Sequence, residues 1–412
     1  MPTPSSVPAN PSRTSLGGVL RVFLVLGLTS FGGPIAHLGY YRREFVERRP
    51  WLTESQFAQL IALTQFLPGP ASSQLGLAVG LARAGWPGAL LAALAFVLPS
   101  AILLVGFAGL VGALAGPTAL AALHGLKLVA LAVVARGVLQ MAQRLCPDPV
   151  RATIATLAAV LILVTGPAVV QLAVVVGGAV AGWLWCRGVG AVAAGELPWR
   201  HGPRQAWTLL GIFAALLIGL PIAAGLWGHE VGLILVVDAF YRAGSLVFGG
   251  GHVVLPLLEE AVVGPGWLTA DEFLSGYGAA QAVPGPLFAI AAYLGALLPA
   301  EIGGGPLLGA AVALVAMFLP GYLLIAGVLP LWRQLAARRD AARAIAGVNA
   351  AVVGLLGAAL YDPVFTSAVR GPADLAIALV GFTLLLAWRA SALLVVAWCV
   401  TGSVLAQLVL AG

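Results

Sequence analysis

Charged residues are scarce in this sequence. Only 9% of its 412 residues are Asp, Glu, Lys or Arg, whereas 61% are hydrophobic, and soluble domains carry roughly 25% charged residues. Apolar runs of about 20 residues, the length needed to span a bilayer core, recur along the whole chain. These runs do not alternate with period two as the strands of a transmembrane barrel do. The composition therefore excludes a soluble protein and predicts an all-α polytopic membrane protein.

Recognisable enzyme and metal sites are also lacking. The three cysteines (Cys146, Cys186 and Cys399) lie far apart, without the spacing of a metal site. The sequence has no P-loop and no nucleophile elbow. The net charge of +6 is read as a topology signal, because Lys and Arg mark cytoplasmic loops. We therefore expect no enzymatic activity, no cofactor, no metal and no nucleic-acid partner, and any transport would use an ion gradient or be passive.

One stretch of the chain occurs twice, as residues 30–80 and 246–295, with a single one-residue gap. Such a recurrence indicates an internal duplication. We predict a disordered polar tail at 1–15, a first repeat at 16–205, a linking transmembrane helix at 206–229 and a second repeat at 230–412. The matches pair Phe31-Gly32-Gly33 with Phe248-Gly249-Gly250, Trp51-Leu52-Thr53 with Trp267-Leu268-Thr269, Phe57 with Phe273, Gln65 with Gln281, and Pro68-Gly69-Pro70 with Pro284-Gly285-Pro286.

Each repeat begins with four short helical arms. They are predicted at 16–31, 35–49, 55–67 and 71–82, and at 231–247, 251–262, 272–283 and 287–298. An arm of about 12–16 residues is roughly 18–24 Å long, which is too short for a core of about 30 Å. The arms are therefore either halves of helices broken in mid-membrane or pairs folded into re-entrant hairpins. Full-length spans are predicted at 86–112, 117–142, 152–166, 168–186, 206–227, 305–331, 344–361, 372–388 and 391–411.

The distribution of basic residues favours hairpins. With hairpins and a cytoplasmic N-terminus, almost all arginines fall on the cytoplasmic side, Arg370 being the exception, and the C-terminus is periplasmic. The loop that holds Arg42, Arg43, Arg48 and Arg49 has a counterpart with Glu259 and Glu260 and no basic residue. We therefore predict two inverted-topology repeats whose broken or re-entrant helices meet near mid-membrane, where the substrate site is expected.

Four helix breaks are the main candidates for this site. Pro removes a backbone donor and Gly permits positive φ, so the breaks expose backbone groups that need a partner. Each break also starts a helix whose N–H groups and dipole attract an anion. The alternative is that the breaks are kinks that serve packing. The breaks are Gly32-Gly33-Pro34, Gly249-Gly250-Gly251, Pro68-Gly69-Pro70 and Pro284-Gly285-Pro286.

Polar side chains beside the breaks are further candidates. Ser72 and Ser73 stand in the first turn after Pro70, where they could bind an oxyanion or only cap the helix, and Phe288 and Ala289 replace them in the second repeat. The glutamines three residues before the two triplets, Gln65 and Gln281, could line a cavity or join helices.

Ionisable residues within spans are costly and are functional candidates by default. Lys127, matched by Asn349, is our best candidate for a cation that faces the substrate, because a buried unpaired ammonium requires an anion. His37 and His252 are candidates for proton coupling, with a hydrogen-bonded interfacial histidine as the alternative. Asp238 and Arg242, four residues apart, are interpreted as an internal ion pair.

Several phrases resemble the chromate ion transporter family: TSFGGPIAHLGYYRREFVERRPWLTE, FLPGP, FGGGHVVLPLLEE and QAVPGP. The resemblance covers both halves and implies the long, two-domain form of the family. It implies a bacterial inner-membrane protein that exports chromate with the proton-motive force and confers chromate resistance. The alternatives are that the substrate is sulfate or another oxyanion, or that the protein is a passive anion channel. The protein could also form a homodimer. The family's signature falls on Gly32, Gly33, Pro34, His37, Arg43, Glu44, Trp51, Gln65, Pro68, Gly69 and Pro70, and on Gly249, Gly250, Gly251, Pro256, Trp267, Gln281, Pro284, Gly285 and Pro286.

Overall fold

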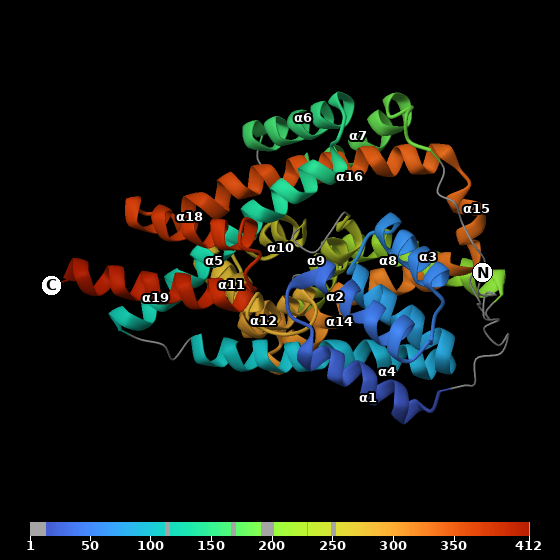
Figure 1. Cartoon of the computed structure of the whole chain (residues 1–412), viewed down its shortest axis with the longest axis horizontal. Coiled ribbons are helices and arrows are strands. Elements are labelled where there is room, and N and C mark those ends of the chain that lie inside the picture. Colours follow the sequence, from blue (N-terminus) through green and yellow to red (C-terminus); the bar gives the residue numbers. More distant parts are fainter. Residues whose placement is uncertain are drawn as a thin grey trace, which may run out of the picture.

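The protein is built from helices, as the sequence predicts. The computed structural model describes residues 14–111, 116–165, 170–190, 202–228, 230–248 and 253–411, and no strand occurs among them. Figure 1 shows the helices packed into one elongated body, with the C-terminal helix at one end. Six helices are long and apolar enough to cross a membrane: 71–111, 117–145, 203–227, 306–336, 339–368 and 392–409. These findings confirm an all-α polytopic membrane protein.

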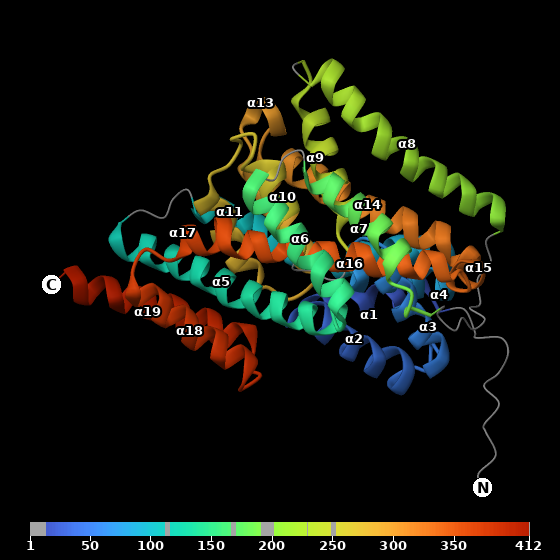
Figure 2. The same ribbon diagram turned by 90° about the horizontal axis from the view of Figure 1, so that it is seen from above.

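The predicted arms and spans of the first half correspond to seven helices. They are α1 (Leu16–Thr29), α2 (Gly33–Arg42) with a π-helical turn (Arg43–Arg48), α3 (Glu54–Phe66), α4 (Ala71–Val111), α5 (Pro117–Leu145), α6 (Pro149–Thr165) and α7 (Val170–Trp185). The linking helix is α8 (Pro203–Trp227). Figure 2 shows α8 at one side of the body, where it packs on α9 and α14.

The second half repeats this order with more interruptions. It comprises α9 (Gly232–Leu246), α10 (Val254–Val262), α11 (Ala270–Ala280), a 3-10 turn (Leu287–Ala289), α12 (Ile290–Leu297), α13 (Ala300–Gly303), α14 (Pro306–Val328), a 3-10 turn (Leu329–Leu331), α15 (Trp332–Ala336), α16 (Arg339–Ala359), a π-helical turn (Leu360–Phe365), α17 (Thr366–Ala368), α18 (Pro372–Leu386) and α19 (Ala392–Ala411).

Local sequence signals explain where the helices begin. Thr53 and Gln56 form a reciprocal capping box at the start of α3, and Thr269 and Glu272 form the equivalent box at the start of α11. Asp148 precedes α6 and accepts a hydrogen bond from the backbone N–H of Arg151. That bond and the Arg151 guanidinium lower the pKa of the Asp148 carboxyl. The same cap residues at matching places position the arms equivalently in both halves.

The boundary predicted between the arm at 71–82 and the span at 86–112 is present in the structure. The two helical segments, which together make up α4, are joined by a kink. The kink falls at Ala84 (φ −140°) and Gly85 (φ +67°), and Pro87 follows in the next turn. Gly85 permits the positive φ that redirects the chain without a connecting loop.

The two halves exchange helices. α1 packs on α4 as α9 packs on α14, which are equivalent pairs within each half. α5, however, packs on α18 and α19 of the second half, and α16 packs on α6 and α7 of the first (Figure 1). A Cβ atom at Gly125 of α5 would lie 2.6 Å from the Cα of Val400, and one at Gly347 of α16 would lie 2.5 Å from the Cα of Gly182. These matching glycines allow the backbones to approach closely, as is common between membrane helices.

Candidate functional site

The two Pro-Gly-Pro triplets lie at loops that reach into the opposite half. Gly69, with φ +118°, donates its N–H to the carbonyl of Val247 at 2.7 Å. Gly285, with φ +101°, donates its N–H to the carbonyl of Ser30 at 2.8 Å. Ser30 and Val247 directly precede Phe31 and Phe248 and are therefore equivalent in the repeat. We call the two loops tip 1 (residues 68–70) and tip 2 (residues 284–286). Each tip thus docks on the end of the other half's first arm.

Each tip also rests on a long helix of the opposite half. A Cβ atom at Gly69 would lie 3.0 Å from the Cα of Gly321 in α14. A Cβ atom at Gly285 would lie 2.7 Å from Oγ of Ser100 in α4. Gly321 follows Pro320, and Ser100 follows Pro99, within their helices. The predicted Pro-Gly-Pro breaks therefore meet the arm ends and the proline positions of both long helices at one junction.

The glycine breaks differ in how far the structure describes them. Gly32 (φ +95°) and Gly33 (φ +77°) have the positive φ expected of them, and Pro34 stands in the first turn of α2. Gly249, Gly250 and Gly251, together with His252, lie outside the described residues.

Polar side chains surround tip 1. Ser72, Ser73 and Gln74, in the first turn of α4, are almost fully buried. Nε2 of Gln74 donates to the carbonyls of Pro68 (2.8 Å) and Gly321 (3.1 Å). Because a carbonyl only accepts, these two bonds fix the orientation of the Gln74 amide. Gln74 therefore holds tip 1 against α14.

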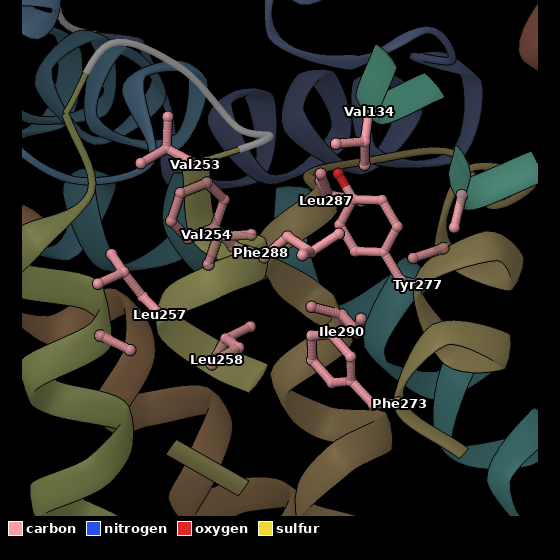
Figure 3. Packing of buried hydrophobic residues seen from close by; sticks show 14 of the residues in the cluster. Val134, Val253, Val254, Leu257, Leu258, Phe273, Tyr277, Leu287, Phe288 and Ile290 are labelled. Atoms are coloured by element: carbon pink, nitrogen blue, oxygen red, sulfur yellow. The ribbon is translucent and has the colours of Figure 1, made fainter. Parts of the chain in front are cut away.

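The helical turn that follows tip 2 lacks the polar residues found after tip 1. Its equivalent positions are Phe288, Ala289 and Ile290, all buried and apolar. Figure 3 shows Phe288 and Ile290 packed among Val254, Leu258 and other hydrophobic side chains. Pro284 and Pro286 flank Gly285 here as Pro68 and Pro70 flank Gly69. The predicted divergence between the two triplets is therefore present in three dimensions.

Sequence reasoning missed two tyrosines near tip 1. The hydroxyls of Tyr41 in α2 and Tyr322 in α14 are buried and have no hydrogen-bond partner within the described part of the chain. Comparison of the two repeats could have found them, because the residues at the equivalent positions are Leu258 and Ala101, whose side chains cannot donate a hydrogen bond.

The two glutamines lie in different environments. Gln65 is exposed on α3, whereas Gln281 follows the last turn of α11 and is half-buried. Nε2 of Gln281 has no hydrogen-bond partner among the described residues. A role in lining the substrate path stays a prediction for both.

His37 joins α2 to tip 2. Its side chain is fully buried, and Nε2 lies 3.1 Å from the Ser30 carbonyl that also accepts the N–H of Gly285. Because the carbonyl only accepts, Nε2 carries the proton in this bond. Nδ1 has no partner in the described structure. His37 is therefore hydrogen-bonded, while its position at a membrane interface and a role in proton coupling stay predictions.

Lys127 is buried as predicted, but its charge is paired. Its residue is 2% exposed, and Nζ lies 2.7 Å from Oδ1 of Asp271 in α11. Arg370 approaches the other oxygen of Asp271 at 3.6 Å. A residue 144 positions away in the sequence therefore supplies an anionic partner for Lys127. Whether Lys127 also contacts substrate stays a prediction.

The remaining polar candidates within the spans are Asn349 and the pair Asp238 and Arg242. Oδ1 of Asn349, the counterpart of Lys127, is buried without a partner among the described residues. Asp238 and Arg242 form the predicted ion pair, at 2.7 Å.

Within the described ranges, no group of three His, Cys, Asp or Glu side chains is arranged to hold a metal ion.

Comparison with known proteins assigns the family. A family model described as "Chromate transporter" matches residues 18–183 and again residues 234–404. This chain belongs to the chromate transporter family. The two matched segments flank α8, in agreement with the duplication seen in the sequence.

Named relatives in this family extend over most of the chain. A "Chromate transport protein" of Pseudomonas aeruginosa is 30% identical over 414 residues, covering 94% of this chain and 91% of the relative. A protein of the same name in Cupriavidus metallidurans is 29% identical, covering 93% and 91%. A "Probable chromate transport protein" of Synechococcus elongatus is 29% identical and covers 84% of each. No solved structure matches the chain.

Several residues that carry the resemblance to chromate transporters fasten the turn between α2 and α3. The ring of Trp51 stacks on Phe45 with centroids 5.3 Å apart, and the Arg83 guanidinium lies 5.5 Å from the Trp51 ring. The Glu44 carboxylate pairs with Arg48 at 3.3 Å and also with Arg49. These contacts give Glu44 and Trp51 a structural role at the end of the arm.

Proposed function

We propose that this protein is a secondary active transporter that exports chromate across the bacterial inner membrane with the proton-motive force. Membership in the chromate transporter family supports chromate transport. The direction, the driving force and the inner-membrane location, with a cytoplasmic N-terminus and a periplasmic C-terminus, are parts of the proposal.

The observation that carries the proposal is the reciprocal docking of the two tips. Gly69 and Gly285 each donate a backbone N–H to the opposite half at equivalent positions. Such an exchange is expected where broken helices of two repeats cross at a shared site. An inverted arrangement of the repeats, with the arms as re-entrant hairpins, is consistent with these contacts and belongs to the proposal.

The chemistry of the crossing suits an anion. α4 begins directly after tip 1, and its first backbone hydrogen bond runs from the N–H of Gln74 to the carbonyl of Pro70, so the N–H groups of residues 71–73 have no intrahelical partners. The positive end of the helix dipole and these N–H groups favour an oxyanion. Positive φ at Gly69 places the tip backbone where a side chain would leave no room. At this crossing, the site would bind chromate by backbone and neutral side-chain groups.

Uptake into inside-out vesicles tests this proposal. In such vesicles, export from the cytoplasm becomes uptake, so an acidic interior should drive chromate accumulation above its external concentration. An uncoupler should abolish the accumulation, and sulfate should be included as a competitor. Equilibration without accumulation would favour the passive anion channel, and stronger transport of sulfate would reassign the substrate.

A further inference from the structure

Three hydroxyl groups near tip 1 are buried without hydrogen-bond partners in the described structure. They belong to Tyr41, Ser73 and Tyr322. Tyr41 is 0% exposed and Ser73 is 1% exposed. A buried hydroxyl without a partner destabilises a fold, and nearly all such groups in native proteins are satisfied by protein, water or ligand. A group of three in one place therefore marks a position where a water or a ligand completes the hydrogen bonds.

The three hydroxyls come from three helices and from both halves of the chain. Oη of Tyr41, on α2, reaches α4, where it would lie 3.0 Å from a Cβ atom at Gly76. The Tyr322 hydroxyl, on α14, faces the Ser73 hydroxyl without completing a hydrogen bond of normal geometry. The hydroxyls of Tyr41 and Tyr322 thus approach the N-terminal part of α4 from α2 and from α14.

Gln74 holds these elements together. Its amide bonds to the carbonyls of Pro68 and Gly321, and Gly321 directly precedes Tyr322. The bonds fix the first turn of α4 relative to α14 and thereby fix the separation of Ser73 and Tyr322. Gln74 is therefore a positioning residue of this cluster.

The equivalent positions in the second repeat carry no hydrogen-bond donors. Leu258, Ala289 and Ala101 replace Tyr41, Ser73 and Tyr322 in the repeat, and Phe288 and Ile290 pack there (Figure 3). None of the five replacement side chains can donate a hydrogen bond to an anion. All three donor positions differ between the repeats. Differences in packing at single sites would not require all three to change together.

We infer that the oxyanion is bound on the tip 1 side, by the hydroxyls of Tyr41, Ser73 and Tyr322 with the free N–H groups at the start of α4, while the turn after tip 2 serves apolar packing. This inference rests on the proposed function and deepens it. The ligand class is a tetrahedral oxyanion that has lost its water shell. Hydroxyl donors point at separate oxygen atoms and carry no charge, so they recognise the anion without binding it too tightly for release.

The experiment compares hydroxyl-free variants of the cluster with hydroxyl-free controls. The test variants are Tyr41→Phe, Tyr322→Phe and Ser73→Ala. The controls are Tyr293→Phe and Tyr241→Phe, whose hydroxyls donate to the carbonyls of Glu272 (3.0 Å) and Phe213 (3.1 Å). Each full-length variant is assayed for chromate uptake in inside-out vesicles and for melting temperature, with and without chromate, after purification in detergent.

The two groups of variants should respond in opposite ways. A hydrogen bond to a charged ligand contributes about ten- to one-hundred-fold in affinity, so each test variant should raise KM for chromate about tenfold or more. Its melting temperature without chromate should stay unchanged or rise, because an unsatisfied buried hydroxyl has been removed. The controls should keep the wild-type KM and lose melting temperature, because they lose a satisfied hydrogen bond.

The outcomes separate this inference from the proposed function. Wild-type KM in Tyr41→Phe and Tyr322→Phe, or a loss of stability like that of the controls, would overturn the hydroxyl site while leaving chromate transport intact. Hydroxyl-dependent stabilisation by chromate without accumulation in vesicles would support the site and overturn proton-driven export. A wild-type protein that neither binds nor transports chromate would overturn both.

Discussion

Substitution of Gly69 is the most direct test of the junction at tip 1. Its φ of +118° is a conformation that a residue with a side chain adopts only under strain of about 1–3 kcal/mol. A Cβ atom there would also lie 2.8 Å from Nε2 of Gln74 and 3.0 Å from Cα of Gly321. Overpacking of this kind costs about 1–3 kcal/mol more. Gly69→Ala should therefore lower the free energy of unfolding by about 2–6 kcal/mol, and Gly69→Val by more.

Gly266 provides a matched control. It has φ +76°, but a Cβ atom there would meet no atom within 4 Å. Gly266→Ala should therefore lower the free energy of unfolding only by the cost of a positive φ for a residue with a side chain, about 1–2 kcal/mol. Ser72→Ala should cost about 0.5–2 kcal/mol of cap or ligand contact. Pro70→Ala should be milder than Gly69→Val, because the missing N–H at the start of a helix has no intrahelical partner to lose.

Melting temperature and chromate uptake in inside-out vesicles check the series. We expect Gly69→Val to transport least and Gly266→Ala to transport normally. Normal uptake by Gly69→Val would refute the close docking of tip 1 on α14. If Ser72→Ala is instead the worst variant, side chains rather than backbone dominate the site.

The same reasoning applies to tip 2 with a different neighbour. A Cβ atom at Gly285 would collide chiefly with Oγ of Ser100, at 2.7 Å, whereas the equivalent residue facing Gly69 is Gly321. Ser100→Gly should therefore partly rescue Gly285→Ala by removing the collision, although the strain of positive φ remains. Equal stability of Gly285→Ala with and without Ser100→Gly would show that the tip does not rest on that position.

The remaining predictions concern charge and topology. Asp271→Ala leaves the buried ammonium of Lys127 unpaired and should lower the free energy of unfolding by about 3–5 kcal/mol. Lys127→Met should lower it less, because the Asp271 side chain is 61% exposed and remains in contact with water. The double variant should be more stable than Asp271→Ala, as measured by thermal melting. Wild-type chromate uptake by that double variant would contradict a role for Lys127 in binding. Cysteines replacing Arg48 and Gly264, in a background without the three native cysteines, should react with an impermeant reagent from opposite sides of the membrane, and labelling from one side would exclude inverted repeats.

Helix positions were predictable where the sequence carries local end signals. The arm expected at 55–67 is α3 (Glu54–Phe66), and the linking helix expected at 206–227 is α8 (Pro203–Trp227). Thr53 and Pro203 mark these starts through capping and a fixed φ. The break between the arm at 71–82 and the span at 86–112 was also predicted, and it falls at Ala84 and Gly85.

The partners of the site residues could not be predicted in the same way. Burial of Lys127 follows from the apolar run around it, but Asp271 belongs to an arm of the other repeat, and only the exchange of α5 and α11 across the halves brings them together. The same holds for Tyr41 and Tyr322, which stand in ordinary apolar segments far apart in the chain. The duplication does allow each residue to be compared with its equivalent in the other repeat. Where a hydrogen-bond donor such as Tyr41 aligns with an aliphatic residue such as Leu258, the two repeats cannot pack in the same way at that position. In a membrane interior, where an unsatisfied polar group is costly, such a difference indicates a ligand more directly than the glycine and proline signature, which both repeats need for their shape.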